Sequence, residues 1–352
     1  MSGGVDSSVA ASLLVEAGHE VVGATLRTFC YTGTPGHAKS CCGLEGVQDA
    51  KGVANALQIP HTVYDVEEEF TRDVIDDFVA EYARGRTPNP CVRCNSFTKF
   101  QDLLHRAREL GADGIATGHY VRMGIGEGGG PALFRGADTG KDQAYFLWGL
   151  PWSALPSLHF PLGSLTKSRV RELARERGLV TADKPESQEI CFVPTGDYRD
   201  LLHRRLEARH PALQPGPFRD RSGNVLGEHG GYAGFTVGQR KGLPGGFPEA
   251  MFVLEIVPEE RAVVLGTRGE LGTEEVVLDS LNWLLPEPPG VDAEVLIQLR
   301  HRARAVPARI LEKVEEEGEL RLHLAQPQPG VTPGQSGVLF RGDRVLGGGR
   351  IL

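Results

Sequence analysis

Apolar positions in the first half of the chain alternate between short continuous runs and runs with helical spacing. The continuous runs, which predict buried parallel strands, lie at residues 19–29, 61–66 and 111–118. The segments that predict helices lie at residues 9–17, 46–58 and 67–84. Because strands and helices alternate, we expect a doubly wound α/β domain with a parallel sheet, which we place at residues 1–200.

The pattern changes after about residue 200, where Gly and Pro become frequent and the predicted strands are short. Segments 252–257 and 262–265 predict a small, mostly-β central domain over residues 201–275. Further apolar strands follow the Pro-rich stretch 285–290, at residues 295–299, 308–311 and 320–324. These strands predict a C-terminal β-barrel over residues 276–352.

The opening stretch Ser-Gly-Gly-Val-Asp-Ser-Ser, from Ser2 to Ser8, predicts a phosphate-binding loop. Gly3 and Gly4 have no Cβ atom, so the backbone can turn with a positive φ and approach a ligand closely. The helix that follows presents an N-terminus, which favours an anion. The loop is not a Walker loop, because no lysine follows its glycines. A buried strand normally precedes such a loop, so we expect the first strand of the sheet to be missing and the natural start to lie upstream.

Composition adds little to this picture, since 352 residues with 40% apolar and 24% charged side chains are typical of a globular protein. No apolar run is long enough to span a bilayer and no signal peptide precedes the loop. We therefore expect a cytoplasmic protein with no membrane partner. The net charge of −8 does not indicate a nucleic-acid binder, and the basic clusters at 167–177 and 300–309 are each interpreted in isolation as solvated faces.

Six cysteines need individual explanations, because thiols in the cytoplasm stay reduced unless they are catalytic or bind metal. Residues 87–95, Thr-Pro-Asn-Pro-Cys-Val-Arg-Cys-Asn, contain a Cys-x-x-Cys pair, and residues 187–192, Ser-Gln-Glu-Ile-Cys-Phe, contain one more cysteine. The pair alone is compatible with half of a zinc site, with a dithiol redox pair or with two buried small residues. Arg93 between the two cysteines would favour a thiolate.

The motifs decide between these alternatives when they are taken in order along the chain. Residues 2–7 resemble the SGGxDS motif of the PP-loop ATP pyrophosphatases, which split ATP between the α- and β-phosphates. The whole set closely resembles the tRNA-specific 2-thiouridylase (MnmA) family over nearly the full chain. Besides the cysteine motifs, this set comprises Thr-Gly-His-Tyr at 117–120, Gly-Lys-Asp-Gln-Ala-Tyr-Phe at 140–146, Phe-Thr-Val-Gly-Gln-Arg-Lys-Gly at 235–242 and Thr-Pro-Gly-Gln-Ser at 332–336.

The resemblance implies a sulfurtransferase that replaces the C2 oxygen of the wobble uridine, position 34 of tRNA, by sulfur. A uracil oxygen is a poor leaving group, so the family transfers AMP from ATP to this oxygen and releases pyrophosphate. A cysteine persulfide then supplies the sulfur, and AMP departs. The implied partners are the anticodon stem-loop of tRNA and a sulfur donor, which is a cysteine desulfurase or a sulfur-relay system.

The resemblance also assigns roles to single residues. Cys191 matches the cysteine that carries the persulfide, and Cys94 matches the nucleophile that attacks it and leaves a Cys94–Cys191 disulfide. The positions that match the ATP site are Ser2, Gly3, Gly4, Val5, Asp6, Ser7, Ser8, Leu26 and Gly118, with Asp6 expected to help place Mg²⁺. The positions that match tRNA contacts or face the extruded target base are Asn89, Pro90, Cys91, His119, Lys141, Asp142, Gln143, Arg300, His301 and Gln335.

Cys91 departs from one branch of the family, which carries an aspartate there as a general acid/base. The third thiol opens an alternative, in which Cys91, Cys94 and Cys191 hold a [4Fe–4S] cluster with one open iron that delivers hydrosulfide. We keep the persulfide and cluster mechanisms as equal alternatives at this point. Cys30, Cys41 and Cys42 are interpreted as structural or incidental, since adjacent cysteines make poor zinc ligands.

Two other functions remain as alternatives. Another PP-loop enzyme, which adenylates a small molecule for ligation, would explain the opening loop without any need for Cys94 and Cys191. A non-catalytic, zinc-stabilised RNA-binding protein would need four ligands with tetrahedral spacing, whereas only three grouped thiols are evident.

Overall fold

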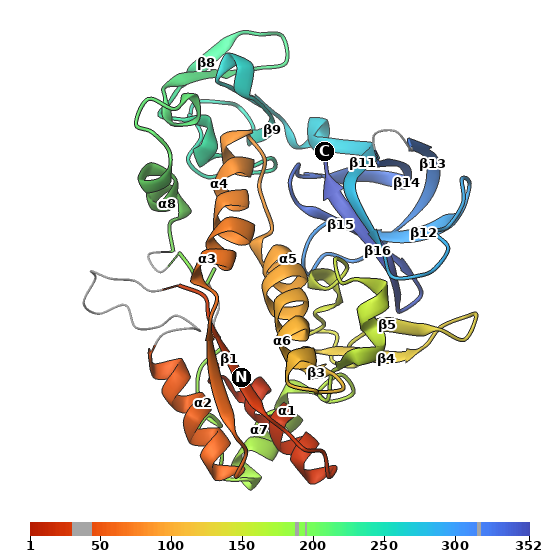
Figure 1. Ribbon diagram of the computed structural model, residues 1–352. Coiled ribbons are helices and arrows are strands. Elements are labelled where there is room, and N and C mark those ends of the chain that lie inside the picture. Colours follow the sequence, from red (N-terminus) through yellow and green to blue (C-terminus); the bar gives the residue numbers. More distant parts are fainter. Residues whose placement is uncertain (30–43, 187–189, 194–195, 315–317) are drawn as a thin grey trace.

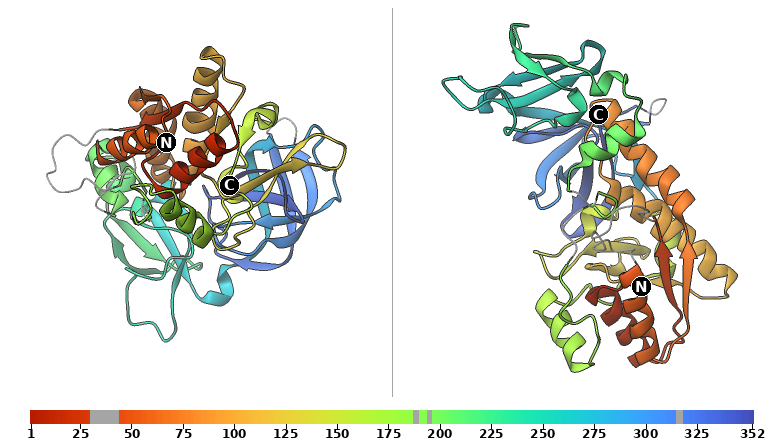
Figure 2. Two further views of the ribbon diagram at one scale, coloured as in Figure 1. Left: turned by 90° about the horizontal axis from the view of Figure 1, so that it is seen from below. Right: turned by 90° about the vertical axis from the view of Figure 1, so that its left-hand side faces the viewer.

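The structure is a computed structural model that describes residues 1–29, 44–186, 190–193, 196–314 and 318–352. It has an α/β domain at one end, and a central domain and a β-barrel share the other end (Figures 1 and 2). The predicted fold class is therefore confirmed. Cys30, Cys41 and Cys42, as well as the first three residues of the motif at 187–192, lie outside the described residues.

The three predicted helical segments of the α/β domain are helical in the structure, and helices at 90–109 and 167–176 were not among them. The predicted helix at 67–84 is one continuous helical rod, which contains a π-helical turn. The helical elements of this domain are α1 (Val5–Glu16), α2 (Leu44–Ala56), α3 (Glu67–Phe70), the π-helical η1 (Thr71–Ile75), α4 (Asp76–Ala83), α5 (Pro90–Arg93), the π-helical η2 (Cys94–Asp102), α6 (Leu103–Glu109) and α7 (Lys167–Glu176).

The parallel strands of the α/β domain form two pairs within the described residues. Strand β1 (Gly23–Arg27) pairs in parallel with β2 (His61–Asp65), and β3 (Ile115–Ala116) pairs in parallel with β6 (Leu158–His159). The predicted strand at 111–118 is thus only two residues long. The chain's opening residues lie beside both pairs, because the hydroxyl of Thr25 on β1 donates to the carbonyl of Met1 at 2.7 Å. On the other side, Gly118 after β3 packs against the backbone of Asp6.

The central domain contains α8 (Tyr198–Arg205) and a four-stranded sheet. Its strands are β7 (Gly216–Arg219), β8 (Val225–His229), β9 (Phe252–Val257) and β10 (Ala262–Gly266), in the order β8-β7-β10-β9. Phe218 and Val263 of this sheet share one apolar core with Phe70 and Phe78 of the α3–α4 rod. The central domain is therefore fixed to the α/β domain through a common core.

The C-terminal strands close into a six-stranded barrel, because β11 pairs with both β14 and β16. The barrel strands are β11 (Gly272–Trp283), β12 (Glu294–Gln298), β13 (Val306–Val314), β14 (Glu319–Pro329), β15 (Ser336–Arg341) and β16 (Arg344–Ile351). The hairpin β4 (Val121–Ile125) and β5 (Pro131–Arg135), which the sequence pattern did not predict, extends this sheet through β16. Closure removes the free edges that an open sheet would expose.

Candidate functional site

The glycines of the opening loop are required by its geometry. Gly3 has φ +69°, and a Cβ atom there would lie 2.2 Å from the carbonyl oxygen of Gly46 on α2. Gly4 is the N-cap of α1 in an extended conformation and has no side chain to cap the helix. The loop is therefore tightly packed on one side, and the first N–H groups of α1 are directed toward its open side.

Serine hydroxyls fix the shape of the loop. Ser7 Oγ accepts from the Ser2 N–H at 3.1 Å and donates to the Gly4 carbonyl at 3.1 Å, and Ser8 Oγ donates to the same carbonyl at 2.9 Å. Ser2 itself is exposed. The loop thus holds its conformation through its own contacts, which is the preorganisation that an anion site needs.

Asp6 is the centre of a polar cluster beside the loop. The Tyr120 hydroxyl donates to Asp6 Oδ1 at 2.7 Å, and the Lys167 ammonium lies 2.7 and 2.8 Å from the two carboxylate oxygens. Burial and the contact with Asp6 raise the pKa of Tyr120, so its hydroxyl keeps its proton. Gly118 packs on the same loop, since a Cβ atom there would lie 2.7 Å from the Asp6 carbonyl carbon.

Leu26 lies near the end of β1, and His119 follows β3, which belongs to the other parallel pair. Leu26 is half-buried on β1, two residues beyond Ala24, which accepts a hydrogen bond from the Met1 amino group. His119 packs between the rings of Phe100 and Phe160, at centroid distances of 5.8 and 6.3 Å, and its Nδ1 pairs with the Thr117 hydroxyl at 2.8 Å. Burial, together with the positive charge of Lys99, lowers the pKa of His119 to about 3. The imidazole is therefore neutral at physiological pH.

The loop that leads to the Cys-x-x-Cys pair is held by all three domains. The Thr87 N–H donates to the Pro333 carbonyl at 2.8 Å, and its hydroxyl donates to that of Thr236 at 3.0 Å. The Gln335 amide donates to the carbonyls of Thr87 and Pro88 at 2.8 and 3.2 Å. The motifs at 235–242 and 332–336 therefore meet at this loop, and the side chain of Gln335 contacts the backbone of the loop.

The cysteines differ in their surroundings. Cys91 is exposed on α5, whereas Cys94, at the start of η2, is half-buried. Cys94 and Cys191 both pack against the apolar cluster that contains Phe70, Phe78 and Phe192. Phe192 is anchored there by edge-to-face contacts with Phe78 and Phe70 at 5.2 and 5.8 Å. The structure thus brings the Cys94 and Cys191 segments to one cluster.

Arg93, between the two cysteines, makes contacts with η1, α4 and η2. Its Nε donates to the Asp73 carbonyl at 3.1 Å and lies 3.7 Å from the Asp77 carboxylate. The guanidinium also lies 4.4 Å over the ring of Phe97. Its charge is therefore directed toward Asp77 on α4, and it supports the helix that follows the pair.

The predicted segment 141–143 makes internal contacts. Lys141 Nζ lies 2.6 Å from Glu186 Oε2, and Gln143 Oε1 accepts from the Tyr120 N–H at 2.9 Å. Asp142 accepts from Arg135 at 2.7 Å and from the N–H groups of Gly136 and Ala144, at 2.9 and 3.2 Å. Asp142 therefore has an architectural role, and the contact of this segment with tRNA stays a prediction.

The basic segment at 300–304 lies against this region. The His301 ring packs on Phe146 at 4.5 Å, and the pKa of His301 is lowered by burial and by Arg302. Arg300 donates to the Pro329 carbonyl at 2.7 Å, and both Arg302 and Arg304 are exposed. Asn95, beside Cys94, donates to the Phe146 carbonyl at 3.1 Å. The barrel's basic loop and the cysteine segment thus contact the same short helix, η3 (Ala144–Phe146).

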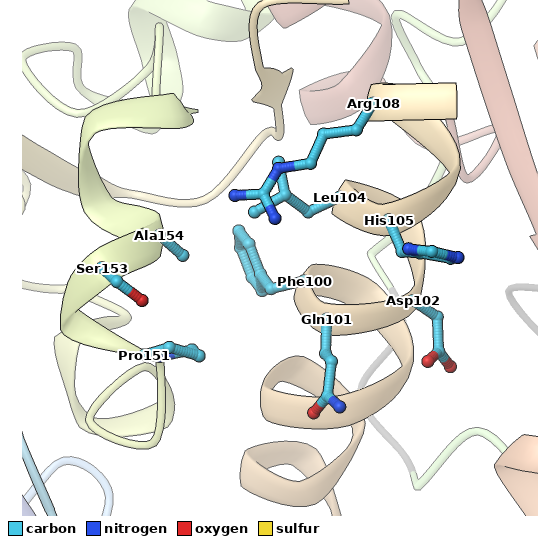
Figure 3. Close-up of a pocket in the computed structure, with 9 residues that line it drawn as sticks. All are labelled: Phe100, Gln101, Asp102, Leu104, His105, Arg108, Pro151, Ser153 and Ala154. Atoms are coloured by element: carbon cyan, nitrogen blue, oxygen red, sulfur yellow. The ribbon is translucent and has the colours of Figure 1, made fainter. Parts of the chain in front are cut away.

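A cleft of about 410 Å³ lies behind the site, between η2–α6 and the 3₁₀-helix η4 (Trp152–Ser157) (Figure 3). Leu104 and Arg108 face Ser153 and Ala154 across it (Figure 3). Phe100 lines this cleft and also contacts His119. None of the predicted site residues lines the cleft.

The residues present do not fit a metal cluster. Among the described residues, no group of three or more His, Cys, Asp and Glu side chains is arranged to hold a metal ion. This finding includes Cys91, Cys94 and Cys191, because all three are described, so the [4Fe–4S] alternative has no ligand set in this conformation. The same finding gives no support to a zinc site built from these thiols.

Sequence reasoning missed several residues of the site. Tyr120 and Lys167 contact Asp6, Asn95 contacts η3, and Glu186 joins Lys141 to Lys167. Tyr120 belongs to the motif at 117–120 and Asn95 to the motif at 87–95. Lys167 was interpreted as part of a solvated face. Its location at the N-terminus of α7, next to α1, could not be predicted from the spacing of residues in the sequence.

The described helices include none with the length and apolar character that crossing a membrane requires.

Three family models match successive parts of the chain. Residues 1–195 match the family described as tRNA methyl transferase HUP domain, residues 203–267 the tRNA methyl transferase PRC-barrel domain and residues 273–351 the aminomethyltransferase beta-barrel domain. A solved structure titled as NMN synthetase from Francisella tularensis is 20% identical and covers 53% of this chain and 64% of its own, with a TM-score of 0.32.

Similar curated proteins cover the whole chain. The chain is 47% identical to the tRNA-specific 2-thiouridylase MnmA of Rhizorhabdus wittichii and 47% identical to that of Rhodospirillum centenum, with all of this chain and 90% of each relative aligned. The MnmA of Carboxydothermus hydrogenoformans is 45% identical, with all of this chain and 96% of the relative aligned. The chain therefore belongs to the tRNA-specific 2-thiouridylase MnmA family.

Proposed function

We propose that this protein is a tRNA-uridine 2-sulfurtransferase, which uses ATP to convert the C2 carbonyl of wobble uridine 34 in tRNA to a thiocarbonyl. Membership of the family supports the enzyme class, the use of ATP and the tRNA substrate. The observation that carries the proposal is that Cys94 and Cys191, far apart in the sequence, pack against one apolar cluster. A cytoplasmic location is part of the proposal, since the substrate is tRNA.

The first step takes place at the opening loop. The C2 oxygen of the uridine attacks the α-phosphorus of ATP, a P–O bond breaks and pyrophosphate leaves. Residues Ser2 to Ser8 with Gly118 and Leu26 bind the nucleotide, and the N–H groups at the start of α1 carry part of the phosphate charge. Asp6 fits a role in holding Mg²⁺, since this ion usually takes one or two carboxylates together with substrate phosphates. Bound Mg²⁺ would supply charge neutralisation.

The second step transfers sulfur. The terminal sulfur of a Cys191 persulfide attacks C2 of the adenylated uridine, and AMP leaves with the C2 oxygen. The Cys94 thiolate attacks Cys191 Sγ and breaks its bond to the transferred sulfur, which stays on C2 as the thiocarbonyl. A Cys94–Cys191 disulfide remains, and an external thiol reductant restores both thiols. A cysteine desulfurase or a sulfur-relay protein then reloads Cys191.

The two-cysteine route is favoured over an iron–sulfur route. Cys91 is exposed and is not part of a metal-ligand set in the described residues, while Cys94 and Cys191 share one apolar cluster. We assign no step to Cys91. In this proposal Asn89, Pro90 and Cys91 face the extruded base. Contacts of Gln335 and Thr87 hold their loop in a fixed position.

The tRNA lies across the α/β domain and the barrel in this proposal. His119 is neutral and stacks with aromatic rings, so it offers the base a hydrogen-bonding and stacking surface without a positive charge. Lys141, Asp142 and Gln143 line the approach with Arg300 and His301, whose segment packs on η3. Exposed Arg302 and Arg304 extend a basic edge toward the phosphates of the anticodon stem.

The test is thiolation of tRNA in vitro with ATP and a persulfide source, in which thiolated tRNA is retarded on a mercury-containing gel. We expect Cys94→Ser and Cys191→Ser to lower thiolation at least 100-fold, because each removes a reacting sulfur. Cys91→Ser is the matched control, because it changes the other cysteine of the Cys-x-x-Cys pair, and it should keep activity within about threefold of the unmodified protein.

Each variant should still bind ATP and release pyrophosphate in the adenylation step, which separates loss of sulfur transfer from loss of folding. Loss of activity in Cys91→Ser, together with a visible absorption band in protein purified without oxygen, would instead support the cluster route. Thiolation that persists in both Cys94→Ser and Cys191→Ser would show that the proposed sulfur transfer is wrong.

A further inference from the structure

Lys167 supplies an ammonium group to the opening loop from a distant part of the chain. It is the first residue of α7, and Thr166 caps that helix by accepting a hydrogen bond from the Arg169 N–H. The Lys167 side chain is only 11% exposed, and its Nζ lies 2.7 Å from Asp6 Oδ1 and 2.8 Å from Oδ2. The loop itself contains no lysine, so Lys167 places at this site the cation that a Walker loop carries within its own sequence.

Glu186 joins this lysine to a second one. Its Oε1 lies 3.1 Å from Lys167 Nζ and its Oε2 lies 2.6 Å from Lys141 Nζ, while Arg171 approaches to 3.8 Å. Burial alone would raise the pKa of Glu186, but hydrogen bonds from the two lysines outweigh burial and lower it. Glu186 is therefore ionised at neutral pH, and one carboxylate neutralises two lysines that come from separate segments.

This arrangement occupies the lysines with internal anions. An ammonium group prefers phosphate or carboxylate oxygens, and it has only three N–H donors to distribute among them. Lys167 contacts both Asp6 and Glu186, and Lys141 contacts Glu186. A phosphate that reaches either lysine must therefore compete with the Glu186 carboxylate.

We propose that Lys167 is a further phosphate-binding residue of the nucleotide site, and that Glu186 occupies Lys167 and Lys141 until phosphates of ATP and tRNA displace it. This inference rests on the proposed function, in which Lys141 contacts tRNA. The first ligand to bind bears the cost of displacing Glu186, and the second ligand does not. ATP and tRNA therefore bind with positive cooperativity, and the coupling is equal in both directions.

The test measures tRNA affinity by filter binding, with and without the magnesium salt of α,β-methylene-ATP. In the unmodified protein we expect the nucleotide to tighten tRNA binding about fivefold or more. Glu186→Gln keeps the shape of the side chain but removes the charge, so it should bind tRNA more tightly without nucleotide and lose the coupling. Lys167→Met should raise the Kd for the nucleotide at least tenfold and leave the Kd for tRNA alone within about twofold.

Asp183→Asn is the matched control, because it also removes one carboxylate near α7. Asp183 pairs with Arg175 at 2.9 Å and its side chain is 80% exposed, far from any role in the cluster. It should leave both affinities and their coupling unchanged. Glu186→Asp keeps the charge on a shorter side chain and should retain part of the coupling between tRNA and nucleotide binding. This variant provides a second measurement if Glu186→Gln fails to fold.

Independent tRNA and nucleotide binding in the unmodified protein, or coupling in Glu186→Gln equal to that in the unmodified protein, would overturn the inference. The binding measurement does not depend on thiolation. A protein that binds both ligands but never thiolates tRNA would contradict the proposed function. The binding data would still show whether Glu186 couples the two ligands. If tRNA does not bind at all, the Lys141 part of the inference is wrong, and nucleotide titration of Lys167→Met decides the rest.

Discussion

His119 shows how a single environment decides what a site residue can do. Burial lowers its pKa to about 3, so the ring carries no charge across the pH range in which enzymes of this kind work. It cannot act as an imidazolium acid, and it offers only a neutral nitrogen and a ring face. Its contacts with Phe100 and Phe160 favour stacking with a base over proton transfer.

The lowered pKa of His119 predicts a pH dependence of stability. Below pH 6.5 the unfolded chain binds a proton at this histidine that the folded chain does not bind until about pH 3. The free energy of unfolding should therefore fall as the pH falls, and His119 should account for about 2 kcal/mol between pH 7 and pH 5. Urea unfolding of the unmodified protein and of His119→Asn at both pH values measures this difference.

His119→Asn serves as the reference protein for this measurement. His61, His229 and His301 also have lowered pKa values, and they contribute equally to the pH dependence of stability in both proteins. His119→Asn is expected to be less stable at pH 7 through lost packing, but to lose less stability on acidification. Parallel stability curves for the two proteins would show that His119 titrates near its ordinary value.

At the scale of elements, sequence pattern predicted most of the secondary structure and little of its arrangement. The apolar spacing at 46–58 and 61–66 predicted α2 and β2 to within about two residues, since α2 buries one face and β2 pairs with β1 along its whole length. The π-helical turn η1 was not predicted within the 67–84 helix, because a π-turn leaves the apolar spacing of a helix almost unchanged. The helix formed by α5, η2 and α6 was not predicted at all. The β4–β5 hairpin was missed because its strands complete a barrel sheet formed mainly by distant residues.

The site was predicted in the same uneven way. Gly3 and Gly118 could be expected at the loop, because close backbone approach requires glycine and both stand in motifs. Lys167 and Glu186 could not, because their contacts depend on where α7 packs and no local pattern reports it. Sequence thus indicates residues whose role is set by local backbone geometry, and misses those whose role is set by tertiary contact.

Gln335 carries a prediction at this scale, because it connects the barrel to the cysteine loop. Gln335→Ala removes both hydrogen bonds to Thr87 and Pro88, so the loop that leads to Cys91 and Cys94 loses a fixed position. We expect kcat for thiolation to fall about tenfold, while the free energy of unfolding drops by only about 1 kcal/mol per lost hydrogen bond. Steady-state kinetics and urea unfolding measure the two effects separately.

Gln328→Ala is the matched control, since Gln328 donates to the Gln326 carbonyl on its own strand, away from the loop. It should change neither kcat nor stability by a measurable amount. A Gln335→Ala protein with unchanged kcat would show that the contacts of Thr87 with Pro333 and Thr236 hold the loop without Gln335.

At the scale of the whole molecule, an ionic cluster joins the α/β domain to the barrel. Arg350 on β16 donates to both oxygens of Asp77 at 3.0 and 3.1 Å and contacts Glu81 at 3.0 Å, both on α4. Glu81 is only 1% exposed, and Arg86 lies between Glu81 and Asp279 of β11, at 3.8 and 3.6 Å. Burial alone would lower the pKa of Arg350, but the neighbouring carboxylates raise it, so the guanidinium stays charged.

This cluster predicts that Arg350 stabilises the contact between the two domains. Arg350→Met leaves the Glu81 carboxylate buried with fewer cations, and we expect a loss of about 3 kcal/mol in the free energy of unfolding. Arg321→Met breaks an exposed pair with Glu312 in the same barrel and should cost less than about 1 kcal/mol. Urea unfolding followed by tryptophan fluorescence compares the two variants.

The same cluster also determines where the cysteine loop lies, because Asp77 contacts Arg93 and the loop at Thr87 rests on the barrel. Arg350→Met should therefore lower thiolation even without urea, where the protein is fully folded. The double variant Arg350→Met with Glu81→Gln should recover part of the free energy of unfolding, because the buried charge is removed together with its partner. Recovery of stability without recovery of thiolation would separate the cost of a buried charge from the positioning of the loop. Equal stability of Arg350→Met and Arg321→Met would mean that the two domains are joined by the apolar cluster in which Phe100 and Tyr145 pack with Val338 and Phe340, without a contribution from the ionic cluster.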